Sequence, residues 1–204
     1  MKTYIFIIAL FGIYTMRCQD ISGKWLQIKN GDTHSIPNVV ILEFQDDTMV
    51  QYDFDKPMFS HQFRLVDGEL FVNNHIWGKV SFINNLRFSL SAKANKKIKE
   101  TVFNMDYVRL MPTDLQFNKD EIEKHSYNFK WNNEEKIISF NKDKPIYDMN
   151  EHSILESVGF TFFISIYRNG IREIVIPIKT ATSAGMELYG MPGKPYSVIA
   201  PINK

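Results

Sequence analysis

The chain of 204 residues lacks the features that support disulfide bonds or nucleic-acid binding. Cys18 is its single cysteine, so no disulfide can form within it. Its formal net charge is only +1, and its longest basic run is the pair Lys96-Lys97. Nucleic-acid-binding proteins carry a concentrated basic patch. We therefore expect no nucleic-acid partner.

The sequence also lacks the readable motifs of catalysis and metal binding. It contains no His-Glu-x-x-His run, no Gly-x-Ser-x-Gly elbow and no glycine-rich phosphate loop. Its histidines stand far apart and not at metal-ligand spacing: His34, His61, His75, His125 and His152. We therefore predict no metal, no cofactor and no catalytic residue. Pairs of carboxylates that meet only in space stay open, because sequence does not show their separation.

The N-terminus is the most informative stretch that is present. Met1 to Thr3 form a short basic start, and Tyr4 to Tyr14 form an unbroken apolar and aromatic run. A helix needs about 20 residues to span a bilayer, so this run is too short to do so, but it suits the core of a signal peptide. We expect residues 1–18 to be a signal peptide. The protein is then exported, to the periplasm, to the outer membrane or out of the cell.

Cys18 follows the apolar run and resembles the lipid-modified cysteine of bacterial lipoproteins. Arg17 departs from that pattern, since a small residue is usual before the cysteine. Three outcomes stay open: a lipid on Cys18, cleavage after Cys18 by the general signal peptidase, and a free thiol. With a lipid, the mature protein is tethered to a membrane through this anchor alone and does not span it.

Beyond the signal, apolar and polar residues alternate and turn dipeptides recur about every ten residues, which predicts antiparallel strands. Residues 19–112 contain about eight such strands, enough to close a small barrel. Asp67-Gly68 predicts a two-residue type I′ turn that pairs Leu65 with Leu70 and Phe63 with Val72 on one face.

Two further hairpins are predicted from the rule that apolar residues share a face. A three-residue loop at residues 46–48 pairs Phe44 with Val50 and Leu42 with Tyr52. A three-residue loop at residues 168–170 pairs Phe160 with Ile178, Phe162 with Ile176 and Ile164 with Ile174. Pro177 cannot donate a ladder hydrogen bond, so we expect a sheet edge or a bulge there.

Residues 118–204 are predicted to form a second, smaller β-rich domain. The charged run at residues 118–124 is interpreted as a solvated connector to this domain. A short helix is expected from the cap Asn150 to the terminating Gly159, because Ile154, Leu155 and Val158 give it one apolar side.

Gly23-Lys24-Trp25 at the head of the first strand, followed by an eight-strand meander, resembles the lipocalin-like proteins. The resemblance covers about residues 20–110 and extends to the closing strand, residues 106–110. It implies that Trp25 packs across the floor of the barrel, that Arg109 lies over Trp25, and that the cup holds a small apolar ligand. The expected fold class is all-β, with a lipocalin-like antiparallel meander barrel before the smaller β-rich unit.

The function expected from this reading is the non-enzymatic binding of a small apolar molecule by a cell-envelope protein. The residues expected to line or floor the cup are Val40, Leu42, Phe44, Phe63, Leu65, Leu70 and Val72. The alternative is a structural or protein-interaction module, with a barrel filled by its own aromatic residues and a C-terminal unit that docks an unknown protein partner. A hydrolase or isomerase acting in the barrel mouth is a third possibility without a readable motif.

Overall fold

The computed structural model describes residues 20–31, 39–93, 102–116, 118–131, 134–140, 151–191 and 196–202. The predicted signal peptide and Cys18 lie outside these ranges. Almost all of the ordered elements are strands, with one short helix among the described residues. The predicted all-β fold class is therefore confirmed.

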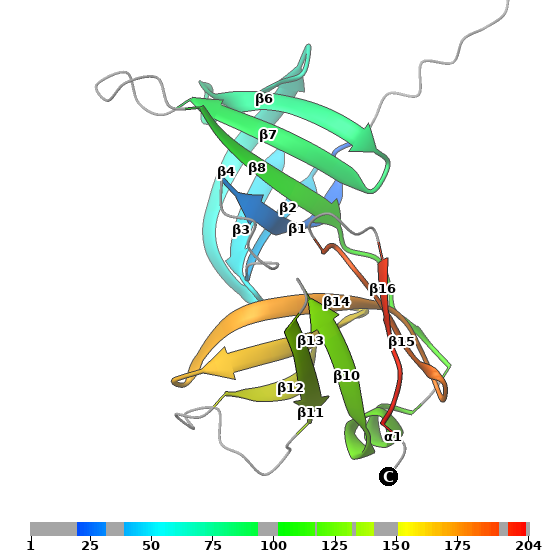
Figure 1. Cartoon of the computed structure of the whole chain (residues 1–204). Helices are drawn as coiled ribbons and strands as arrows, with labels where there is room; N and C mark the ends of the chain where they lie inside the picture. The colour runs from blue at the N-terminus through cyan, green and yellow to red at the C-terminus, as the bar shows by residue number, and fades with distance from the viewer. Residues whose placement is uncertain are drawn as a thin grey trace, which may run out of the picture.

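The N-terminal half is a closed antiparallel barrel in which each strand pairs with its neighbours in sequence (Figure 1). The last strand, β8, pairs with β1 and closes the barrel. This is the meander barrel that the alternating pattern predicted. Its strands are β1 (Gly23–Asn30), β2 (Val40–Gln45), β3 (Thr48–Asp53), β4 (Lys56–Val66), β5 (Glu69–Val72), β6 (His75–Asn84), β7 (Arg87–Lys93) and β8 (Val102–Arg109).

The β4–β5 hairpin has the predicted register. Leu65 pairs with Leu70 and Phe63 with Val72. Asp67 and Gly68 have φ angles of 52° and 80°, as a type I′ turn requires. Turn chemistry and the burial of one face agree at this hairpin.

The β2–β3 register differs from the predicted one. A two-residue turn at Asp46-Asp47 pairs Phe44 with Met49 and Leu42 with Gln51, so the three-residue loop is wrong. The prediction assumed that only one face of these strands is apolar. Leu42 and Met49 face the barrel core, whereas Ile41 and Tyr52 pack on the outside against the C-terminal unit. Because both faces have apolar partners, the shared-face rule could not select the register.

The C-terminal unit contains a bent sheet with the strand order β12-β13-β14-β15-β16, to which β9 adds beside β14 (Figure 1). A separate ribbon, β10–β11, covers one side of this sheet (Figure 1). The elements are β9 (Asp114–Leu115), α1 (Lys119–Lys124), β10 (Ser126–Trp131), β11 (Glu134–Ser139), β12 (His152–Val158), β13 (Thr161–Arg168), β14 (Ile171–Thr182), β15 (Gly185–Tyr189) and β16 (Tyr196–Ile199).

Two predicted elements of this half are wrong. The charged run is not merely a solvated connector, because Asn118 caps the helix α1 and Ile122 is fully buried in the core. The expected helix before Gly159 is the strand β12 instead. Its residues pair with β13 from His152 to Val158, and the apolar spacing that suggested a helix reflects a strand with buried residues on both faces.

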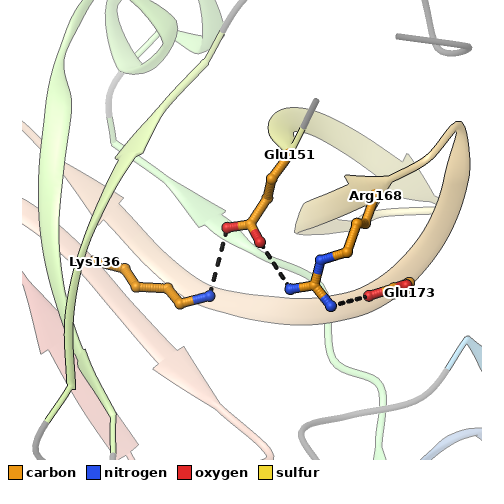
Figure 2. Close-up of polar contacts among 4 residues, drawn as sticks. All are labelled: Lys136, Glu151, Arg168 and Glu173. Atoms are coloured by element: carbon orange, nitrogen blue, oxygen red, sulfur yellow. Dashed lines mark hydrogen bonds and ion pairs between the residues drawn. The ribbon is translucent and has the colours of Figure 1, made fainter. Parts of the chain in front are cut away.

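The β10–β11 ribbon meets both edges of the sheet through isolated bridges. Tyr127 pairs with Pro201 beyond β16, and Phe140 pairs with Ser153 of β12. Figure 2 shows an ion-pair network beside the second seam, in which Glu151 binds Lys136 of β11 at 3.4 Å and Arg168 of β13 at 2.8 Å. The strands therefore surround one apolar core.

The β13–β14 hairpin has neither the predicted loop nor the predicted pairs. Asn169 and Gly170 form a two-residue turn with φ angles of 53° and 72°, which Arg168 and Ile171 close. A register shift between Ile166 and Tyr167 then pairs Ile166 with Ile174 and Ile164 with Ile176. The bulge lets the chain keep the Asn-Gly turn and still put these isoleucines on one face.

Pro177 lies where β14 changes partners. It is the last residue that pairs with β13, and the ladder with β15 begins at the next residue, Ile178. The strand therefore tolerates a residue without an N–H group at this point.

The barrel and the C-terminal unit share a third apolar core. Leu26, Ile41 and Val108, on the outside of the barrel, are buried with Phe163 and Val175 of the sheet. The segment that joins the two units is tied into the sheet: the backbone N–H of Met111 donates to the Tyr189 hydroxyl at 2.9 Å, and the Thr113 hydroxyl donates to Ile178 O at 2.7 Å. The two units are thus packed together and not loosely tethered.

A partly buried ion pair lies at the edge of this contact. Arg172 donates two hydrogen bonds to Glu156, at 2.8 and 2.9 Å, and its guanidinium lies 4.1 Å from the ring centre of Phe54 in the β3–β4 turn. Burial works against the charge of Glu156, but the bonds and charge of Arg172 and the hydroxyl of Tyr167 outweigh it. The pKa of this carboxyl is therefore held below its ordinary value.

We predict that the free energy of unfolding falls as the pH drops through the lowered pKa of Glu156. A group whose pKa is lowered by folding stabilises the protein fully above its unfolded pKa, here about 4.5, and loses this effect on protonation. Glu156→Gln should cost about 1–2 kcal/mol at pH 7 and flatten the acid limb of a urea-unfolding profile. Glu151→Gln, in the more exposed network of Figure 2, is the control and should cost less than about 0.5 kcal/mol. Equal effects of the two substitutions would contradict this assignment.

Candidate functional site

One end of the barrel, which we call the floor, is closed by Ile21, Trp25 and Arg109. The Trp25 indole is fully buried and donates to Ile21 O at 2.6 Å. The Arg109 guanidinium lies 4.5 Å from the centre of the Trp25 ring and donates to Asp20 O. Gly23 begins β1 beside Arg109, with a φ of +102° that favours glycine. Trp25 and Arg109 thus have the arrangement that the resemblance implied.

A layer of aromatic side chains fills the barrel above the floor. The ring centres of Trp25 and Phe88 are 4.7 Å apart, those of Phe88 and Tyr107 are 4.8 Å apart, and those of Phe44 and Phe63 are 4.9 Å apart. Burial raises the pKa of Tyr107 well above its usual range, so this phenol stays neutral at any physiological pH. This half of the barrel is a packed core.

The residues predicted to line the cup divide into two groups. Leu42, Phe44 and Leu70 are at most 1% exposed and belong to the packed core, so a ligand at their level would have to displace other side chains. The other four face the interior but are only half-buried, as expected nearer to solvent; they are Val40, Phe63, Leu65 and Val72. The predicted set is therefore inward-facing, but part of it lies too deep to form an open surface.

The opposite end of the barrel, where β4, β6 and β8 begin, is the mouth. Trp25 pairs with Leu42, Leu42 with Gln51, and Gln51 with Phe59. These four residues therefore lie in one row on the inward face, from the floor to the mouth. On β8, the inward face that holds Tyr107 continues toward the mouth to Met105 and then Phe103, at every second residue. Phe59 is 54% exposed and Phe103 is 45% exposed, so solvent reaches the inward face at this end.

Polar groups accompany the aromatic residues at the mouth. His61 stacks on Phe59 with their planes 7° apart, and its Nδ1 lies 2.9 Å from the side-chain nitrogen of Asn73. Trp77 and Val72 are half-buried and pack against the barrel core. This surface offers apolar contact with a few hydrogen-bonding groups, which is the composition of small-molecule sites.

Phe59, Trp77 and Phe103 were missed by the sequence analysis. The alternation of Phe103, Met105 and Tyr107 was a usable signal, because it places all three on one face of a strand. Phe59 precedes His61 and Phe63 at the same spacing. The sequence did not show at which end of the barrel this inward face becomes exposed to solvent.

We predict that Trp25→Ala lowers the free energy of unfolding by about 3–5 kcal/mol, the usual cost of removing a fully buried aromatic side chain. Trp77→Ala is the matched control and should cost clearly less, because Trp77 is only partly buried. Equilibrium unfolding in urea measures both. An equal cost for the two variants would contradict the described floor.

In the part of the chain that the structure describes, no helix is long and apolar enough to cross a membrane. Nor do the described His, Cys, Asp and Glu residues form a group of three or more that could hold a metal ion. No protein-family model, no curated protein and no solved structure matches the chain.

Proposed function

We propose that this is an exported, non-enzymatic protein of the cell envelope that binds a small apolar molecule in the mouth half of a lipocalin-like barrel. One observation carries the proposal: the barrel is closed by Trp25 and Arg109 at one end and presents inward-facing, exposed Phe59 and Phe103 at the other. A cup of this kind removes apolar ligand surface from water, which is worth about 25 cal/mol per Å².

The packed aromatic layer limits where the ligand lies. Because Phe44, Phe88 and Tyr107 are buried in the same core, the ligand rests above them and contacts side chains of the mouth half. The candidates are half-buried or exposed residues on the inward face: Val40, Phe59, Val72, Trp77, Met105 and Phe103. A short or compact molecule fits this position better than a long chain that must reach the floor.

The same aromatic layer favours a second candidate function. A barrel whose deep half is already full serves equally well as a rigid support, and the C-terminal β-unit then docks a protein partner. The two functions differ in whether the purified protein holds a small molecule. Native mass spectrometry of protein purified from its own cells distinguishes them, since a co-purifying small molecule supports the binding function.

The binding function predicts that filling the mouth abolishes the uptake of an apolar probe. Ala92 pairs with Gly78 and Phe103 on the inward face, so Ala92→Trp places a large ring in the proposed site. We expect it to weaken the binding of N-phenyl-1-naphthylamine at least about tenfold, measured by probe fluorescence.

The control is Ser60→Trp, which adds the same side chain near the same end but on the outward face. Ser60 pairs with Val50, which in turn pairs with the outward-facing Glu43. This variant should bind the probe as the unmodified protein does. If the unmodified protein does not bind the probe, or if both variants bind it equally well, the barrel is not the site.

A further inference from the structure

Exposed apolar side chains gather at the mouth of the barrel. The described residues of the barrel include six exposed large apolar side chains, and four of the six lie near the start of β4, β6 or β8, the strands that begin at this end. We call these four side chains the rim residues: Met58, Phe59, Ile76 and Phe103, with exposures of 53%, 54%, 60% and 45%. The other two are Val66 and Ile83, near the floor end. Exposed apolar groups gathered in one place generally mark a contact surface.

The rim residues are spread around the opening and do not lie side by side on one strand pair. β4, β6 and β8 alternate in the closed strand order, so the rim residues span about half of the circumference. Another part of the opening, at the β3–β4 turn, is covered by the C-terminal unit, where Phe54 packs on Phe163. Apolar side chains distributed around the end of a barrel meet a flat surface together, whereas a bound helix or strand needs them in a row.

The rim is continuous with the inward face of the barrel. Phe59 and Phe103 belong to both, because each is exposed at the mouth and aligned with buried core residues through the cross-strand pairs. A molecule that moves from a contacting surface into the barrel therefore meets these two aromatic side chains first and the apolar core beyond them. Full hydration of an apolar ligand, which is the costly step of transfer, is avoided on this path.

We infer that the rim docks on the surface of a lipid bilayer and that the barrel takes up a small apolar molecule dissolved in that bilayer. The inference rests on the proposed function for the identity of its cargo, but the docking itself stands on the rim residues. Among the residues that the structure describes, the charges near the rim are mixed, since exposed Asp53 and Asp55 stand beside Lys56. The expected surface is therefore a neutral one, bound through apolar contact and not through attraction to anionic lipid.

The test measures flotation of the protein with vesicles of phosphatidylcholine. The rim variant is Met58→Ser with Ile76→Ser, neither of which belongs to the inward row that ends at Phe59. Its matched control is Val66→Ser with Ile83→Ser at the floor end, where the side chains are similarly exposed. We expect the rim variant to lower the vesicle partition coefficient at least about tenfold and the control to change it less than about twofold. Adding anionic lipid or salt should leave the binding of the unmodified protein nearly unchanged.

Several results would overturn the inference. They are an unmodified protein that stays with the aqueous phase, equal loss in both variants, or binding that appears only with anionic lipid. A rim-dependent dimer in size-exclusion chromatography would show that a second copy covers the rim instead. Thermal unfolding of both variants confirms that they fold.

The binding of N-phenyl-1-naphthylamine in the absence of vesicles separates this inference from the proposed function. The rim variant should keep its affinity for the probe, because it leaves the inward face intact. Probe binding without vesicle binding would refute the docking alone. Vesicle binding without probe binding would refute the proposed cargo site and leave the docking in place.

Discussion

The apolar contact between the outside of β1, β2 and β8 and the C-terminal sheet determines much of the remaining structure. Leu26, Ile41 and Val108 point away from the barrel core and would be solvent-exposed in a free-standing barrel, yet each is at most 3% exposed. Burying such a side chain is worth about 1.5–3 kcal/mol, so the contact contributes a substantial part of the stability. It covers one side of the barrel and the part of the mouth at the β3–β4 turn, and it leaves the rim residues and the outside of β4 to β6 to solvent.

This contact also explains which registers could be read from sequence. The β4–β5 hairpin lies away from the C-terminal unit, its pattern has one apolar face, and Asp67-Gly68 gave the correct pairs. In β2 and β3 both faces are buried, so alternation could not decide between registers. In β13–β14 the Asn-Gly turn and the shared apolar face favoured different registers. A bulge between Ile166 and Tyr167 satisfied both, and the prediction had considered only regular ladders. The strand β12 looked helical for the same reason, because residues on both of its faces are buried.

The sequence predicted which residues of the candidate site face inward, but not how far into the barrel the site extends before the packed core begins. Trp25 was identified from a short motif and Arg109 from the family resemblance, and all seven proposed lining residues do face inward. Whether an inward-facing residue touches a ligand or another side chain depends on packing across the barrel, which involves residues far apart in the sequence, such as Trp25 and Phe88. The exposure of Phe59 and Phe103 follows from barrel closure and from the placement of the second unit, and neither is encoded in local sequence.

The placement of the β10–β11 ribbon has a consequence for the behaviour of so strand-rich a chain among other proteins. An open sheet edge presents unpaired N–H and C=O groups to which a foreign strand can add, and this is a common first step toward aggregation. Here the ribbon meets β12 through Phe140 and the chain beyond β16 through Tyr127, and the carboxylate of Glu151 lies beside the first of these seams. A charge at a seam discourages strand addition, because the incoming strand would have to desolvate it. The same arrangement that encloses the C-terminal core thus guards the sheet edges against unwanted pairing.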